Sequence, residues 1–79
     1  MELENFTILV KILKLDIVSE LEVYPEGTKY EIHLGGIPIS TIEYLFDRPE
    51  RWYQVKGRLS RVDVATIGEA IKLLLFLDN

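Results

Sequence analysis

The chain has 79 residues with no cysteine and one histidine, which excludes a second domain and disulfide bonds and argues against a zinc site. Hydrophobic residues make up 48% of it, which excludes a disordered chain, and charged residues interrupt every apolar run before it reaches membrane-spanning length. We therefore expect one α+β domain over residues 1–79, placed in the cytoplasm because cysteine is absent and the N-terminal residues lack the basic flank of a signal peptide.

The first predicted element is an N-terminal helix over residues 3–18. Its apolar residues follow the spacing of a buried helical face: Phe6, Leu9, Val10, Leu13 and Ile17. The same stretch is rich in β-branched residues, and apolar residues also alternate along it at Phe6, Ile8, Val10 and Ile12. The helix is the expectation, and a strand is the alternative.

The centre of the chain predicts a three-stranded antiparallel meander over about 20–40. Apolar and polar residues alternate over 21–24 and 29–34, on either side of Pro25, Gly27 and their neighbours, which suit a turn. Gly35 and Gly36 then indicate a second tight turn into a strand at 37–39.

Two or three helices are expected after the meander. Residues 40–43 have the spacing of a capping box for a short helix through Phe46, and residues 47–50 indicate a second start, although a strand over 52–56 is the alternative. A long C-terminal helix then begins after Ser60 and packs on the sheet or on a partner. Its predicted core stripe consists of Val64, Ile67, Ala70, Ile71 and Leu74.

Charge is distributed unevenly along the chain. The net charge is -4, yet all four arginines fall in residues 48–61, which we call the basic segment. Its candidate interaction residues are Arg48, Arg51, Trp52, Tyr53, Lys56, Arg58 and Arg61. Arginines interleaved with aromatic residues can grip phosphates and stack on bases, but a sequence pI near 4.9 favours a protein partner over a nucleic acid.

The last residues of the chain predict self-association. The run 73–77 is apolar around the whole circumference of a helix, and a monomer of this size has little interior to bury it. We therefore expect an oligomer interface at Leu73, Leu75 and Phe76.

No motif predicts catalysis, a cofactor or a metal site. His33 shares a polar strand face with Lys29 and Glu31, which is the pattern of a solvated sheet and lacks a nucleophile. The sequence therefore predicts a non-catalytic protein-binding or regulatory module that acts as a homo-oligomer and does not bind membranes. One alternative is a nucleic-acid or phosphate-binding accessory protein that uses the basic segment. The other is a small enzyme or ligand-binding protein with a site between subunits near His33 and Tyr30.

Overall fold

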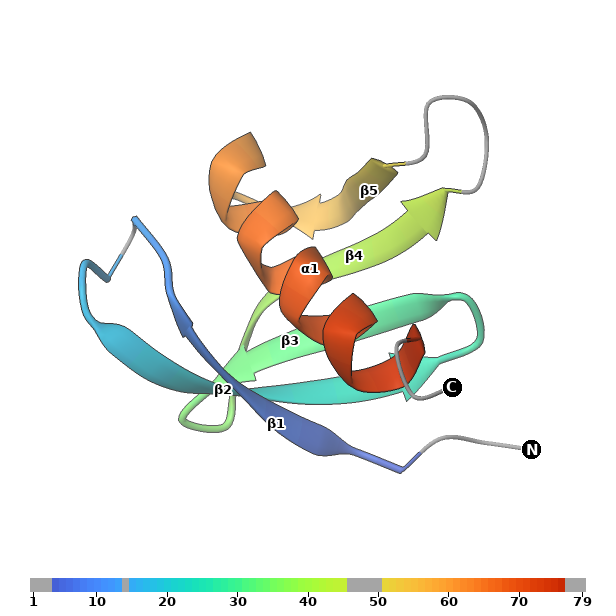
Figure 1. Cartoon of the computed structure of the whole chain (residues 1–79), viewed down its shortest axis with the longest axis horizontal. Helices are drawn as coiled ribbons and strands as arrows, with labels where there is room; N and C mark the ends of the chain where they lie inside the picture. The colour runs from blue at the N-terminus through green and yellow to red at the C-terminus, as the bar shows by residue number, and fades with distance from the viewer. Residues whose placement is uncertain (1–3, 14, 46–50, 77–79) are drawn as a thin grey trace.

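The structure of the chain is an antiparallel sheet covered on one face by a helix (Figure 1). It is a computed structural model that describes residues 4–13, 15–45 and 51–76, without the side chain of Phe76. The strands lie side by side in chain order: β1 (Phe6–Lys11), β2 (Val18–Glu26), β3 (Lys29–Leu34), β4 (Ile37–Leu45) and β5 (Arg51–Gly57). The helix α1 (Arg61–Phe76) follows β5 in the chain.

The expected N-terminal helix is wrong, because residues 6–11 form strand β1. Pairing of β1 with β2 places Ile8 opposite Leu21 on the face that α1 covers, and Val10 and Ile12 are buried on the same side. Leu9, which the helical stripe placed in the core, faces away from α1 and is 70% exposed. The apolar residues of this segment are therefore buried with the two-residue period of a strand, and not with the period of a helix.

The meander expected over 20–40 lies within the sheet as β2, β3 and the first part of β4. Gly27, Gly35 and Gly36 have positive φ angles, as the two tight turns require. The short helix expected over 40–46 is wrong, since β4 continues as a strand to Leu45. Ile42 and Tyr44 alternate into the core, and the Ser40 hydroxyl contacts β5 instead of capping a helix.

Residues 51–57 form a strand, so the helical interpretation of this segment is wrong and the strand alternative is right. Register explains this outcome, because Trp52 pairs with Tyr44 and Gln54 with Ile42 on the face under α1. In the parts of the chain that the structure describes, α1 is therefore the single helix, where two or three were expected after the meander.

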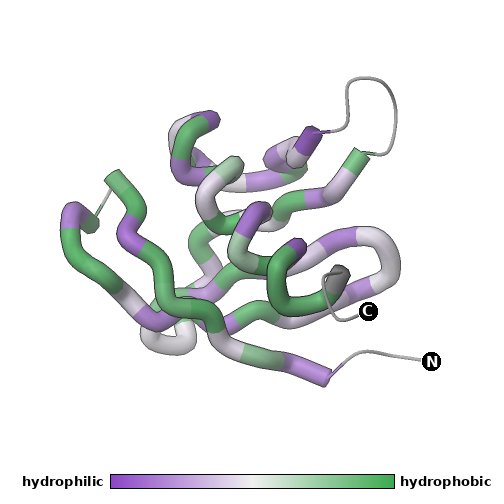
Figure 2. Tube along the Cα trace, viewed as in Figure 1, coloured by the Kyte–Doolittle hydropathy of each residue, from purple (hydrophilic) through white to green (hydrophobic). Residues whose placement is uncertain are grey.

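The core lies between α1 and the covered face of the sheet. Val64, Ile67 and Ile71 point from the helix onto the strands, as their spacing predicts. Leu74, also predicted in the stripe, is half exposed, whereas Leu75 packs against the core. Figure 2 shows hydrophobic residues concentrated along β1 and in the C-terminal half of α1.

The start of α1 is fixed to the connection between β1 and β2. The Ser60 hydroxyl caps the helix by accepting from the Asp63 backbone N–H at 3.1 Å. Asp63 is 2% exposed, and its Oδ1 accepts from the Leu13 backbone N–H at 2.7 Å. This contact holds the end of the β1–β2 hairpin against the first turn of the helix. No helix in the described ranges is both long enough and apolar enough to cross a membrane.

Candidate functional site

A groove of about 690 Å³ lies between strand β5 and helix α1. Residues 51–54 of β5 form one wall and residues of α1 form the other, with Leu59 between them; the helix residues are Arg61, Val64, Ala65 and Glu69. Successive residues of a strand point to opposite faces, so a groove that touches four in a row follows the edge of β5. Among the described strands β5 pairs only with β4, which leaves its other edge open to this groove.

Gln54 builds the end of the groove by holding the connection that leads from β5 into α1. Its Oε1 accepts from the Leu59 backbone N–H at 3.1 Å, and its Nε2 donates to the Leu59 carbonyl at 2.9 Å. The Ser40 hydroxyl donates to the same Oε1 at 2.7 Å, which ties this contact to β4. Leu59 is thereby kept buried at the base of the groove.

Gly57 is required where β5 ends beside this contact. Its φ angle is +119°, a conformation that residues with a side chain rarely adopt. A Cβ atom at this position would lie 2.7 Å from the Ile39 carbonyl oxygen and 2.8 Å from Gln54 Oε1. The sharp departure of the chain from β5 toward α1 therefore depends on a glycine.

Trp52 forms the floor of the groove and is packed from several sides. Its indole lies against Gly68 of α1, where any side chain would overlap it, and its ring centroid is 4.9 Å from that of Tyr44. The ring centroid of Tyr30 lies 5.8 Å from that of Trp52, and burial raises the pKa of the Tyr30 phenol. Trp52 is thus a structural anchor with one part at the groove surface, rather than a freely projecting stacking platform.

The groove is lined by more positive than negative charge. Arg51 and Arg61 are exposed at its walls, and Glu69 is the acidic residue among those that line it. Arg58 is exposed in the connection between β5 and α1 but does not line the groove. Of the candidate interaction residues predicted in the basic segment, the groove therefore brings together Arg51, Trp52, Tyr53 and Arg61, while Arg48 lies outside the described residues.

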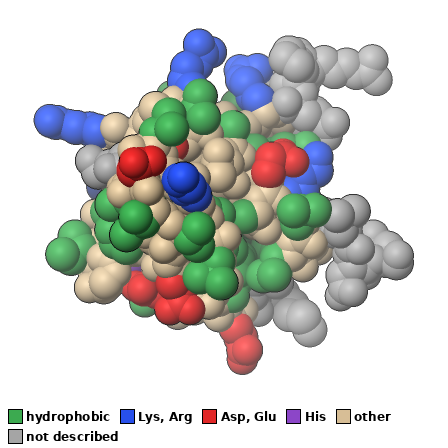
Figure 3. Space-filling view, turned by 60° about the vertical axis from the view of Figure 1, so that its left-hand side comes forward, with side chains coloured by type: hydrophobic (Ala, Val, Ile, Leu, Met, Phe, Trp, Pro, Cys, Tyr) green, Lys and Arg blue, Asp and Glu red, His purple; other side chains and the backbone are tan. Residues whose placement is uncertain are grey.

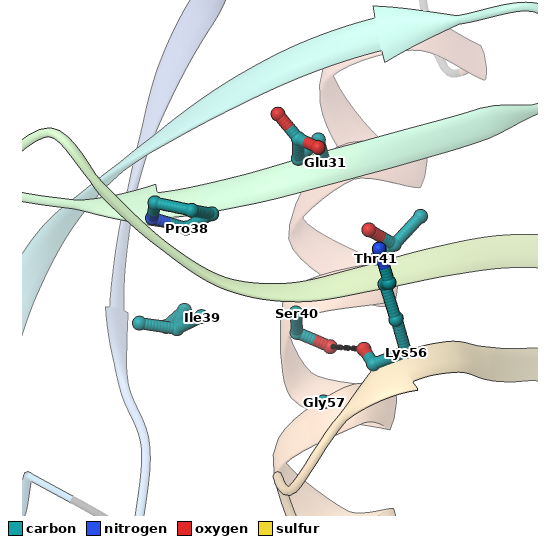
Figure 4. Close-up of a pocket in the computed structure, with 7 residues that line it drawn as sticks. All are labelled: Glu31, Pro38, Ile39, Ser40, Thr41, Lys56 and Gly57. Carbon is teal, nitrogen blue, oxygen red and sulfur yellow. Dashed lines mark hydrogen bonds between the residues drawn. The ribbon is translucent and has the colours of Figure 1, made fainter.

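Lys56 belongs to a second and smaller pocket of about 300 Å³, where β4 begins and β5 ends (Figure 4). There its side chain extends past Thr41, and Glu31 of β3 lies across from it. The Ser40 hydroxyl is 3.2 Å from the Lys56 carbonyl, as the dashed line in the figure marks. The predicted interaction residues are consequently divided between two surfaces, and the larger one adjoins the strand edge.

His33 lies on the open face of the sheet, away from α1. Its Nε2 is 2.7 Å from Glu31 Oε1, and its ring packs on Tyr24 with centroids 4.3 Å apart. Tyr30 points to the covered face instead, so the structure does not bring His33 and Tyr30 together as one site. Within the described ranges, no three histidine, cysteine, aspartate or glutamate residues are grouped as metal ligands.

The predicted oligomer residues have different environments. Leu73 is 60% exposed, as a contact residue would be, and Leu75 packs against the core. The side chain of Phe76 lies outside the described part of the structure.

Sequence reasoning missed most of the groove other than its arginines and aromatic residues. The missed residues are Gln54, Leu59, Val64, Ala65 and Glu69. The signal for Gln54 was its position two residues after Trp52, which on a strand places both on the same face. That signal requires the segment to be interpreted as a strand first.

Comparison of the chain with protein-family models, with curated proteins and with solved structures found no match in any of the three.

Proposed function

We propose that the chain is a non-catalytic protein-binding module that takes an extended, acidic segment of a partner into the groove between β5 and α1. The observation that carries this proposal is the open edge of β5 inside that groove. A segment added to the edge would pair with backbone groups of β5, while its alternate side chains would meet the groove. Because cysteine is absent, we propose the cytoplasm as its compartment.

The chemistry of the walls supports an acidic partner. Apolar contact surface comes from Trp52, Leu59 and Val64, and charge comes from Arg51 and Arg61. Arginine binds carboxylates through a planar pair of N–H groups, and complementary charge steers a partner toward the site. The remainder of the chain is acidic, so attraction of an acidic segment is confined to this side of the molecule.

Trp52 provides a direct test, because it is the only tryptophan and it lies in the groove. A display library of random linear peptides is selected on the protein, and the enriched peptides are titrated while Trp52 fluorescence is recorded. We expect peptides with acidic residues flanking an aliphatic one, and a shift of Trp52 emission that saturates with peptide.

Two exposed positions of α1 provide a matched pair of variants. Ala65→Arg fills the groove and should abolish both peptide binding and the fluorescence change. Val62→Arg adds the same side chain to the same helix at a position that does not line the groove, and should leave both unchanged. Equal binding by the two variants, or no enriched peptide at all, would reject the proposed site.

A single-stranded oligonucleotide serves as the competing ligand in the same titration. The contacts of Trp52 with Gly68 and Tyr44 leave little of the indole free to stack on a base. We expect no quenching at physiological salt. If the oligonucleotide binds tightly, quenches Trp52 fluorescence and loses affinity steeply with rising salt, the partner is a nucleic acid and not a protein.

A further inference from the structure

The second edge of the sheet, strand β1, has exposed apolar residues on its open face. Among the described strands β1 pairs only with β2, so its outer edge carries unpaired backbone groups. Leu9 is 70% exposed on the open face, and Val18, diagonally across the β1–β2 pair from it, is 64% exposed. Ile17 and Leu13 extend this exposed surface into the connection between the two strands.

Apolar surface also flanks β1 on the covered face, where α1 lies. Asp63, Ala70 and Leu74 follow one side of the helix at intervals of seven and four residues. Because Asp63 bonds to Leu13 just beyond β1, this side of α1 is the one directed toward the β1 edge. Leu74 is 52% exposed there. Figure 3, which turns the left-hand side of Figure 1 forward, shows hydrophobic side chains interspersed with charged ones over the face that it presents.

We propose that β1 pairs antiparallel with β1 of a second copy of this chain, with Leu9 at the two-fold axis. In this register Ile8 faces Val10 of the second copy and the partly buried Phe6 faces Ile12, so apolar positions of the covered face meet each other. On the open face Leu9 meets its own symmetry mate, and Lys11 lies opposite Thr7 of the second copy. The pattern of apolar and polar side chains along β1 is therefore complementary to itself, which is what a two-fold interface requires.

Two further features favour a second copy over an unrelated partner. A two-fold axis perpendicular to the sheet keeps both helices on one face, so the half-exposed Leu74 of each copy lies on the same side of the joined sheet. On the open face, Lys11 would approach Glu22 of the second copy, which neighbours Thr7 within its own sheet. The dimer leaves the β5 groove at the far edge of each copy free.

Single-cysteine variants test the register, because the chain has no cysteine of its own. In an antiparallel pair, directly opposed Cβ atoms lie about 4.5–5.5 Å apart, close to the range that a disulfide spans. Leu9→Cys should therefore form a covalent dimer under mild oxidation at micromolar concentration. Tyr53→Cys, an exposed position on the other edge strand, is the matched control and should remain monomeric on a non-reducing gel.

Charge substitutions then test the same interface at equilibrium. Leu9→Asp should raise the dimer dissociation constant by more than about tenfold in sedimentation equilibrium, because two like charges would meet at the axis. Val55→Asp, an exposed position on β5, should leave the dissociation constant unchanged. Far-UV circular dichroism shows whether each variant remains folded. We expect both to fold, because both residues are exposed.

Three outcomes would overturn the proposal. The first is a monomer mass for the unmodified protein over a hundredfold dilution range that begins at high micromolar concentration. The second is a dimer that Leu9→Asp does not weaken, and the third is equal crosslinking by Leu9→Cys and Tyr53→Cys. A dimer that dissociates with Val55→Asp instead would assign self-association to the β5 edge.

Discussion

At the scale of single residues, the contact between Gly68 and Trp52 determines how closely α1 approaches β5. Trp52 occupies the space where a side chain at position 68 would stand, so the helix and the strand meet through a glycine. A glycine inside a helix is otherwise unfavourable by roughly 0.5–1 kcal/mol relative to alanine. Its presence in the middle of α1 is therefore explained by packing and not by helix formation.

Replacing this glycine gives the first prediction. Helix propensity alone would make Gly68→Ala stabilising, whereas overlap with the indole should lower the free energy of unfolding by about 1–3 kcal/mol. Urea denaturation followed by circular dichroism measures the difference. In the double variant Gly68→Ala/Trp52→Leu, the added methyl group should cost less than in the single variant, since the smaller side chain leaves room for it. A stabilised Gly68→Ala protein would contradict the packing shown here.

At the scale of elements, the connection between β5 and α1 is held by a side chain rather than by regular backbone pairing. Gln54 makes two hydrogen bonds with the backbone of Leu59 and accepts a third from Ser40. These contacts come from β4, β5 and the connection, so one residue coordinates three segments. The shape of the groove therefore depends on Gln54, although it carries no charge.

Gln54→Ala should lower the free energy of unfolding by about 1–3 kcal/mol, because it leaves the N–H and carbonyl groups of Leu59 without their side-chain partner and removes one acceptor of the Ser40 hydroxyl. It should also weaken peptide binding in the groove by displacing Leu59. Gln54→Glu retains an accepting oxygen but places a second, negatively charged oxygen against the Leu59 carbonyl, so it should not restore the wild-type stability. Thermal unfolding and Trp52 titration measure the two effects, and wild-type values for Gln54→Ala in both would disprove this role.

At the scale of the whole molecule, charge is polarised between the basic segment and the rest of the chain. The net charge is -4 although all four arginines are clustered in residues 48–61. Arg51, Arg58 and Arg61 are exposed on the β5 side, and Glu20 and Glu26 are exposed on β2. A partner with acidic residues should be steered to one side, and high salt should reduce this steering.

The prediction at this scale concerns association rates. With an acidic peptide selected on the groove, the association rate should fall as salt rises, and Arg51→Glu should slow it and flatten its salt dependence. Lys29→Glu, an exposed change of equal charge on β3, should alter the rate much less because it lies outside the groove. Stopped-flow fluorescence of Trp52 measures the association rate of the peptide with both variants. An equal decrease of that rate in the two variants would show that it depends on the net charge and not on the position of the charge.

The local pattern of the sequence was sufficient to predict the meander over about 20–40 and the last helix. Glycines mark the two tight turns, alternation marks the strands, and Ser60 with the stripe of Val64, Ile67 and Ile71 marks the helix. The clustering of arginines is likewise a property of the sequence, and four of the seven candidate interaction residues predicted from it line the groove: Arg51, Trp52, Tyr53 and Arg61.

Tertiary structure alone decided the rest, because residues 6–12 satisfy both a helical and a strand period. Pairing with β2 selected the strand, since it buries Ile8, Val10 and Ile12 together and leaves Leu9 and Leu13 outside. Residues 51–57 became a strand for the same reason, through pairing with β4. The groove could not be read from the sequence, because its walls come from β5 and α1 and exist only once Trp52 packs against Gly68. The local pattern of apolar residues shows which side chains can share a face of a helix or of a strand. Pairing with distant strands determines which of these two sets of side chains is buried in the core.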